Sequence, residues 1–380
     1  MENGSFLTTQ IITYLGNKRK LLDHIAFEVD RILQEMGVEK AIICDLFSGS
    51  GVVARKLKQY SSRLYVNDLE KYSYIINDCY LTNRCDFNED FYQDCLSKIL
   101  SYPDVEGVIT QNYAPQNDND IKDGERVFYT HRNAVRIDTI REAIDVYVPN
   151  SYKKYFLAPL LYEASVHVNT SGVFKGFYKS KENNIGKFGG DGENALERIC
   201  GEIKLSKPVF SNYDTLVTLL NEDANDVVKH LKGLDITYID PPYNQHPYGS
   251  NYFMLNTIIE NKLGNNISKV SGIPDDWNKS LYNKKNDALS VFNELISNLD
   301  SKYVIVSYNN EGFMSKDNII EILSRYGSLV VKDIDYITFR GSRNLNNRSK
   351  HTTEYLFILK KGIDCGQIKD MTQENQPGCF

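Results

Sequence analysis

Unbroken apolar runs recur along this chain and indicate buried strands. One of them, 41–47, is followed by a glycine-rich turn and then by a helix at 52–60. An earlier stretch, with Leu22, Ile25 and Val29 at helical spacing, predicts a long helix before this strand. The other runs predict further strands, the last two as a closing antiparallel pair, at 63–67, 215–220, 234–239, 302–308, 329–339 and 353–360.

The alternation of strands and helices stops at about residue 101. A polar loop at 111–120 precedes a helix at 133–147, and a second helical stretch at 153–168 should kink or restart at Pro159. Strand periodicity returns only at 215. We therefore interpret the intervening segment as inserted, mainly helical material and not as another strand–helix unit.

Two stretches are basic. The segment 171–190 interleaves lysines with aromatic residues and contains one acidic residue, Glu182, and a second basic run joins the last two predicted strands. Loops of this composition can contact nucleic-acid phosphates and bases, although solvated surface loops have the same composition. The candidate contacts are Lys175, Lys179, Lys181, Lys187, Arg340, Arg343 and Arg348.

The strand at 234–239 ends in Asp240-Pro241-Pro242-Tyr243. Two prolines cannot extend a sheet ladder, so this segment should form a rigid corner at the edge of the sheet. The carboxylate of Asp240 and the neighbouring backbone carbonyl make a pair of acceptors suited to an amino group with two hydrogens, and Tyr243 offers an aromatic face. An ordinary strand-to-loop turn is the alternative.

The strand at 41–47 leads into Ser48-Gly49-Ser50-Gly51. A glycine-rich turn between a strand and a helix lets the backbone approach a ligand closely, as in nucleotide sites. Asp68 follows the next strand and can accept both hydroxyls of a ribose. Because residues 49–54 also match G-x-G-x-x-A, a nicotinamide dinucleotide remains open as the ligand.

The amino-acid composition limits the classes of protein to which this chain can belong. With 380 residues, 41% hydrophobic and 25% charged, the chain is an ordinary globular protein of one large or two smaller domains. A net charge of -6 argues against non-specific coating of nucleic acid. The seven cysteines and six histidines show no ligand spacing, so we expect no metal. The sequence contains neither an apolar stretch of about 18 residues nor a signal pattern, so we expect no membrane segment and a cytoplasmic location.

The order of these motifs resembles that of the Dam-like, alpha-class DNA adenine-specific N6-methyltransferases, which include restriction-system modification methylases. The matching segments are Tyr14-Leu15-Gly16-Asn17-Lys18, Asp45-Leu46-Phe47-Ser48-Gly49-Ser50-Gly51, Asn67-Asp68 and Asp240-Pro241-Pro242-Tyr243. The resemblance covers roughly residues 10–361. It implies a Rossmann-like α/β fold whose seven-stranded sheet binds S-adenosylmethionine at the carboxyl ends of its strands.

The same resemblance implies four segments in the chain. The methyltransferase domain would comprise an N-terminal, cofactor-binding part at 1–100 and a C-terminal, catalytic part at 215–362. A target-recognition insert would lie between them at 101–214, and 363–380 would be a tail.

The resemblance also implies methylation of a flipped adenine in double-stranded DNA. Asp240 and the carbonyl of Pro241 would accept the two amino hydrogens, with Pro242 and Tyr243 completing the catalytic motif. Lys18 would lie near the methionine carboxylate of the cofactor. Asp68 would hold its ribose, and Asp223 would contact its adenine. The expected cofactor contacts are Tyr14, Lys18, Asp45, Ser48, Gly49, Gly51, Asp68, Asp223 and Asp240.

Other functions stay open at this point. A nicotinamide-dependent oxidoreductase explains the glycine-rich turn but neither the corner nor the basic stretches. An amino-group methyltransferase acting on RNA or protein more often has Asn where this chain has Asp240, and it lacks a large insert. A DNA-binding module with an inactive site is the third alternative. If the chain is a modification enzyme, a separately encoded restriction endonuclease is a candidate partner.

Overall fold

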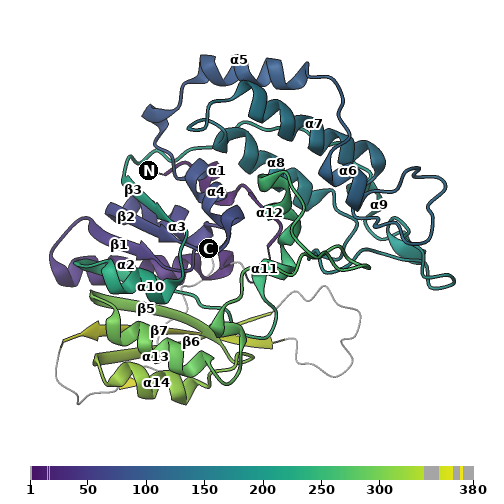
Figure 1. Cartoon of the computed structure of the whole chain (residues 1–380). Coiled ribbons are helices and arrows are strands. Elements are labelled where there is room, and N and C mark those ends of the chain that lie inside the picture. Colours follow the sequence, from purple (N-terminus) through teal and green to yellow (C-terminus); the bar gives the residue numbers. More distant parts are fainter. Residues whose placement is uncertain (1, 15, 17, 338–350, 363–368, 371–380) are drawn as a thin grey trace, which may run out of the picture.

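A computed structural model describes residues 2–14, 16, 18–337, 351–362 and 369–370, which form one mixed β-sheet with helices on both faces and a helical layer beside it (Figure 1). The strands are β1 (Ala41–Asp45), β2 (Ser61–Asn67), β3 (Leu216–Leu220), β4 (Leu234–Ile239), β5 (Ser301–Asn309), β6 (Gly327–Ile337), β7 (His351–Lys361) and β8 (Lys369–Asp370).

The strand order is β3-β2-β1-β4-β5-β7-β6-β8. Strands β3, β2, β1, β4 and β5 are parallel, whereas β7 runs antiparallel to both β5 and β6. The chain leaves β1 toward β2 on one side and returns in β4 on the other, so the order reverses between β1 and β4. Ligands of open α/β sheets bind at the carboxyl ends of strands at such a switch point.

Alternate residues of the strands pack against different helices. In β1, Cys44 packs with α10 (Ala224–His230), α13 (Ala288–Asn298) and α14 (Lys316–Ser324), whereas Ile43 packs with α2 (Leu22–Met36) and α3 (Val52–Leu57). In β5, Val304 and Ile305 divide between the same two faces. A strand covered on both sides is apolar at every position, which explains the unbroken apolar runs in the sequence.

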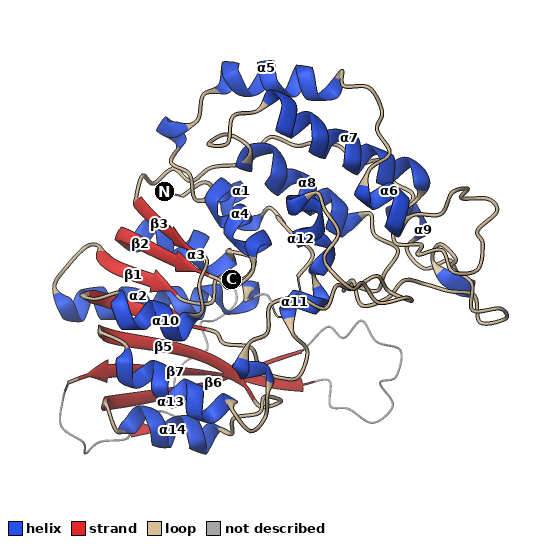
Figure 2. Ribbon diagram, in the orientation of Figure 1, coloured by secondary structure: helices blue, strands red, loops and turns tan. Residues whose placement is uncertain are grey.

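Besides the apolar packing on the two faces of the sheet, a separate hydrophobic core lies in the helical layer, whose helices Figure 2 shows beside the sheet. It contains buried residues of α5 to α8 together with residues of α4, which follows β2, and α12, which follows the corner. The helical layer therefore shares its core with two elements next to the carboxyl end of the sheet. The helices are α1 (Gly4–Thr8), α2 (Leu22–Met36), α3 (Val52–Leu57), α4 (Lys71–Tyr80), α5 (Glu89–Leu100), α6 (Val108–Tyr113), α7 (His131–Tyr147), α8 (Lys154–Val166), α9 (Leu196–Ile199), α10 (Ala224–His230), α11 (Tyr248–Asn251), α12 (Phe253–Glu260), α13 (Ala288–Asn298) and α14 (Lys316–Ser324).

The predicted α/β fold is confirmed, and each strand expected from the sequence is present. The two-residue β8 adds to the sheet at β6, within the stretch expected to be a tail; the rest of that tail, 363–368 and 371–380, lies outside the described residues. The expected restart at Pro159 is wrong, because α8 continues through this buried proline. Apolar packing around α8 outweighs the missing N–H group. Within the described ranges, no helix is long and apolar enough to cross a membrane.

Candidate active site

The corner (Asp240–Tyr243) is fixed from two sides. Strand β4 lies between β1 and β5, and its pairing with β5 extends to Ile239. Beyond the two prolines, the carbonyl oxygen of Tyr243 accepts hydrogen bonds from the Phe313 N–H at 2.9 Å and from the Tyr308 hydroxyl at 3.3 Å. The sheet and the loop after β5 therefore hold the corner in place.

The carboxylate of Asp240 is held by two side chains. Its Oδ1 accepts a hydrogen bond from the Tyr243 hydroxyl at 2.5 Å and lies 3.2 Å from Lys18 Nζ. Burial raises the pKa of Asp240 to about 6, Lys18 and Tyr243 oppose the rise, and Glu354 adds to it. Lys18 also donates a hydrogen bond to the Tyr243 hydroxyl and lies 4.5 Å from the centroid of its ring.

Glu354 is a site residue that the sequence did not predict. It lies on β7, is 1% exposed, and places its Oε1 3.2 Å from Lys18 Nζ. Burial lowers the pKa of Lys18, but the charges of Asp240 and Glu354 outweigh it, so this pKa lies above its ordinary value. The one signal in the sequence was an acidic residue inside an otherwise apolar predicted strand. We call Lys18, Asp240, Tyr243 and Glu354 the corner cluster.

A first cavity, which encloses about 890 Å³ of space together with its open mouth, lies at the switch point between β1 and β4. The acidic residues lining it are Asp45, Asp68, Glu70, Glu222, Asp223 and Asp240, and among its described lining residues Lys18 is the one lysine or arginine. A cavity with this excess of carboxylates suits a ligand that brings positive charge and hydrogen-bond donors. Of the expected cofactor contacts, it is lined by Tyr14, Lys18, Asp45, Ser48, Gly49, Asp68, Asp223 and Asp240, but not by Gly51.

Two carboxylates of the first cavity have different surroundings. Both oxygens of Asp45 are buried, and burial raises its pKa, as do the charges of Asp240 and Asp68, whereas the backbone N–H groups of Ala54 and Phe47 oppose the rise. Asp68 instead accepts hydrogen bonds from the N–H groups of Gly49 at 2.7 Å and Glu70 at 2.8 Å. Burial raises the pKa of Asp68 to about 6 in spite of these bonds.

The two glycines of the turn after β1 are required for different reasons. Gly49 has a φ of +50°, and a Cβ there would lie 3.1 Å from the ring of Tyr14, at the wall of the first cavity. Gly51 has a φ of +73°, and a Cβ would lie 2.3 Å from the side-chain oxygen of Asn77. Gly51 therefore serves the packing of α4 beneath the turn, whereas Gly49 keeps the cavity wall close.

A second cavity, of about 1190 Å³, adjoins the first on the other side of the corner. Tyr243 and Glu354 line it together with Lys175, which the sequence assigned to a basic loop. The lining residues common to both cavities are Gly16, Lys18, Asp240, Pro242 and Tyr248. Ligands in the two cavities would therefore meet at the corner.

Tyrosines form one side of this meeting point. The ring of Tyr14 stacks against those of Tyr248 and Tyr252, with centroid distances of 5.1 and 4.9 Å, and the latter two rings lie 6.1 Å apart. Tyr248 is a further residue to which the sequence assigned no role, because nothing in its local pattern distinguishes it from a buried helix residue. The stack connects the N-terminal segment to α11 and α12.

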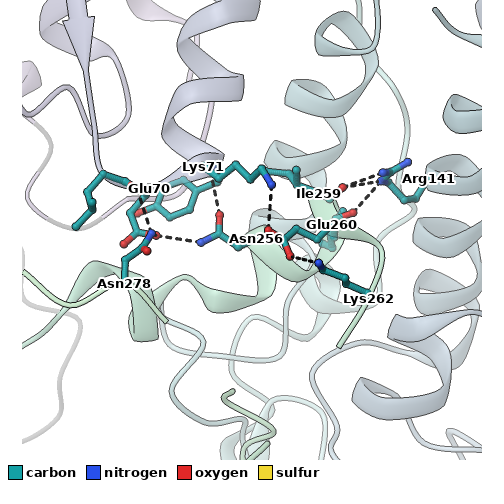
Figure 3. A network of polar contacts seen from close by, with 11 residues as sticks. Glu70, Lys71, Arg141, Asn256, Ile259, Glu260, Lys262 and Asn278 are labelled. Carbon is teal, nitrogen blue, oxygen red and sulfur yellow. Dashed lines mark hydrogen bonds and ion pairs between the residues drawn. The ribbon is translucent and has the colours of Figure 1, made fainter. Parts of the chain in front are cut away.

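A different set of polar contacts links the first cavity to the helical layer (Figure 3). Glu70 accepts hydrogen bonds from the side-chain amides of Asn256 at 3.0 Å and Asn278 at 3.4 Å. At the other end of α12, the Arg141 guanidinium donates to the carbonyls of residues 258 and 259 at 2.8 to 3.2 Å. Between them lies an ion pair of 3.0 Å from Lys71 to Glu260. We call these residues the wall network: Glu70, Lys71, Arg141, Asn256, Glu260 and Asn278.

The predicted basic contacts have varied surroundings. Lys175 and Lys181 are exposed, Lys179 lies 5.3 Å from the ring centroid of Phe177, and Lys187 pairs with Asp191 at 3.6 Å. The other expected contacts, Arg340, Arg343 and Arg348, lie outside the described residues. In the part of the chain that the structure describes, no group of three or more His, Cys, Asp or Glu residues is arranged to hold a metal ion.

Comparison with known proteins gives consistent matches. Residues 14–322 match the model of the family described as D12 class N6 adenine-specific DNA methyltransferase. Type II methyltransferase M.NlaIII of Neisseria lactamica is 30% identical over 357 residues, covering 92% of this chain and 99% of that protein. Type II methyltransferase M.CviAII of Paramecium bursaria Chlorella virus 1 is 31% identical, covering 92% and 98%.

Two further matches are partial or remote. Type II methyltransferase M.FokI of Planomicrobium okeanokoites is 28% identical, and the match spans 53% of its length. Among solved structures, magnesium protoporphyrin IX methyltransferase from Synechocystis PCC 6803 with bound SAM covers 91% of this chain and 85% of its own, at 9% identity and a TM-score of 0.30.

Proposed function

This chain belongs to the D12 class of N6 adenine-specific DNA methyltransferases, and from that premise we propose that its first cavity binds S-adenosylmethionine and its second cavity binds the target adenine. The enzyme methylates adenine at N6 at specific DNA sites and uses S-adenosylmethionine as methyl donor. The observation that carries the proposal is the position of Asp240, which lines both cavities.

The residues of the first cavity fit this donor. The buried carboxyl group of Asp45 lines this cavity and suits the positive charge that the donor carries. Asp68 keeps lone pairs for the two ribose hydroxyls beside its backbone contacts, and Asp223 lies on the wall for the adenine ring. Lys18, expected near the methionine carboxylate, lines the same cavity, where its ammonium contacts Asp240 and Glu354.

The corner prepares the amine for reaction. The nitrogen of an adenine amino group is a weak nucleophile because its lone pair is delocalised into the ring. When Asp240 and the carbonyl of Pro241 accept its two hydrogens, the nitrogen becomes more tetrahedral and its lone pair is directed toward the first cavity. S-adenosylmethionine, when bound there, supplies the electrophilic methyl group. Preorganised acceptors and alignment carry the catalysis, and the proton leaves the amine with or after methyl transfer.

The target nitrogen lies inside the DNA duplex, so the adenine must be flipped out to reach the corner. Stacking of the base on Tyr243, which lines the second cavity, contributes roughly 1–3 kcal/mol against the cost of unstacking. Lys175, exposed at the same cavity, is suited to a phosphate next to the flipped nucleotide. Lys179, Lys181 and Lys187 extend this basic surface along the same loop.

The substrate, the segment that recognises it and the partner of the enzyme can also be assigned. We assign double-stranded DNA as the substrate and residues 101–214 as the target-recognition insert. The similar proteins are named type II methyltransferases, which supports a separately encoded restriction endonuclease as the partner of this enzyme. The cytoplasmic location expected from the sequence remains a prediction.

The test is transfer of labelled methyl groups from S-adenosylmethionine to unmethylated plasmid DNA, followed by mapping of the modified bases. We expect N6-methyladenine at one recurring short sequence. Label on cytosine, or none on DNA while RNA or protein is labelled, would contradict the proposal. A parallel binding titration of NAD and S-adenosylmethionine checks the ligand of the first cavity.

A further inference from the structure

Glu354 occupies an unusual position for an acidic residue. On β7 it lies opposite Asn309 of β5 and Ile334 of β6, in the interior of the sheet. The next residues on its face of the strand, Leu356 and Ile358, pack into the core beneath α2. Burying a carboxylate at the end of this apolar row is costly unless a cation is held against it. Its partner is the ammonium of Lys18, at the start of the helical segment that leads into α2.

The contacts of Lys18 account for each of its hydrogens. An ammonium has three N–H donors, and Lys18 directs them at Asp240 Oδ1, Glu354 Oε1 and the Tyr243 hydroxyl. The Tyr243 hydroxyl in turn donates to the same Oδ1 of Asp240. Asp240 Oδ1 is thus contacted twice, whereas Asp240 Oδ2 has no partner among the described residues. Oδ2 is the oxygen that remains to accept a hydrogen from a substrate.

The ammonium of Lys18 is shared between two carboxylates. It lies 3.2 Å from both Asp240 Oδ1 and Glu354 Oε1. If Lys18 were paired with Asp240 alone, it would neutralise the acceptor. Sharing the ammonium with Glu354 preserves the negative potential at Asp240, where an amine gains positive charge as it is methylated.

We propose that Glu354 is a positioning residue for methyl transfer: it holds the Lys18 ammonium so that Asp240 Oδ1 is occupied and Asp240 Oδ2 remains available as the acceptor for the adenine amino group. This inference rests on the proposed function of the corner. Glu354 acts through Lys18 and does not itself touch the reacting atoms.

The pH dependence of the rate separates this role from a structural one. The groups that act on Asp240 are Lys18, Glu354, Tyr243, Tyr238, Asp45 and Tyr248, and Glu354 is among those whose charge raises the Asp240 pKa. Methyl transfer requires ionised Asp240, so the rate should fall on the acid side near its pKa of about 6. Removing the charge of Glu354 lowers this pKa and moves the acid limb to lower pH.

The experiment measures methyl transfer to a target-containing DNA duplex across pH for four proteins: wild type, Glu354→Gln, Glu354→Asp and Asp333→Asn. The last is the matched control, because Asp333 is an exposed acid on neighbouring β6 that pairs with Lys316 at 2.8 Å, away from both cavities. We expect Glu354→Gln to lower kcat by about 10- to 100-fold, to leave the KM for S-adenosylmethionine within about twofold, and to shift the acid limb downward. Asp333→Asn should match wild type in all three.

The charge-conserving variant completes the test. Glu354→Asp keeps the carboxylate but lengthens its contact with Lys18, so it should lower kcat less and leave the acid limb where wild type has it. If thermal scans show that Glu354→Gln is unfolded, this variant carries the test, and a wild-type kcat for it overturns the inference. An unmoved acid limb in a folded Glu354→Gln also overturns it. If wild type itself does not methylate adenine, the proposed function fails instead.

Discussion

The corner cluster and the wall network flank the same cavity, but their buried polar groups are paired in different ways. In the wall network, a buried guanidinium satisfies the last carbonyls of α12, and the neutral amides of Asn256 and Asn278 both donate to Oε2 of Glu70. In the corner cluster, Asp240 and Glu354 share the single ammonium of Lys18, and the acceptor oxygen of Asp240 is left open.

This difference distinguishes residues that contribute mainly to stability from residues that contribute mainly to function. A buried polar group whose partners are complete adds to a fixed structure, because removing any partner leaves a group unsatisfied. A buried group whose partners are incomplete is held at a cost to stability, and the gain lies in binding or in catalysis. The comparison therefore predicts activity losses at the corner and stability losses at the wall.

The largest effect should come from Asp240→Ala. We expect turnover to fall by about 100-fold or more, on the scale of removing one well-placed polar group from a catalytic site, while S-adenosylmethionine still binds. Removing a buried acid whose pKa is raised should not lower the midpoint of thermal unfolding. Single-turnover label transfer and cofactor titration measure the two effects, and equal losses of affinity and turnover would contradict the role of Asp240.

The opposite result is expected for Arg141→Ala. This change leaves the carbonyls of residues 258 and 259 buried without their donor, at a cost of roughly 1–3 kcal/mol per group. Urea unfolding measures the loss, and turnover per folded molecule should stay within about twofold. Lys71→Ala is the control, because its ion pair with Glu260 is partly exposed and should contribute less than about 1 kcal/mol. A large fall in turnover for Arg141→Ala would remove the distinction between the two clusters.

The stability of the folded protein should depend on pH. Burial raises the pKa of Glu70 to about 7 and of Asp68 and Asp240 to about 6. Because each lies above its unfolded value, the stability gained from the neutral form is complete at low pH and is lost as pH rises through the folded pKa. The free enzyme should therefore unfold at lower temperature at pH 8 than at about pH 5. Glu70→Gln should flatten this slope in differential scanning fluorimetry and preserve turnover; an unchanged slope would contradict it.

The smallest effect should come from the basic loop, outside both clusters. Lys179→Ala should weaken DNA binding a few-fold and reduce the slope of log K against log salt by about 0.9, as expected for one lost phosphate contact. Fluorescence anisotropy at several salt concentrations measures this. Lys204→Ala, which removes an exposed lysine paired with Glu202 at 3.1 Å, is the control. Equal slopes for the two variants would place Lys179 on the solvated surface.

The sheet could be predicted from the sequence because its strands are covered on both faces. Residues such as Ile43 and Cys44 point in opposite directions yet both meet helices, so the apolar runs are continuous and easy to recognise. The course of α8 was harder to predict. A proline such as Pro159 tends to interrupt a helix, but this tendency competes with packing that only the folded chain reveals. The helical layer was expected, but not that it shares a core with α4 and α12.

The parts of the candidate site that form short contiguous motifs could be predicted from the sequence. The residues whose role depends on a distant partner could not. Asp240 to Tyr243 and the turn at Gly49 are short patterns with a physical meaning of their own. Glu354 gains its meaning only from Lys18, which lies 336 positions earlier in the chain. Tyr248 likewise depends on a stack with Tyr14. No window of sequence contains either pair.

The antiparallel β7 joins almost the whole length of the chain into one contact. Lys18 and Glu354 lie 336 positions apart, yet the two form one buried ion pair. A chain that ends after the corner contains Gly49, Gly51 and Asp240 but still lacks Glu354. A product truncated before β7 would lack Glu354 and should therefore be inactive.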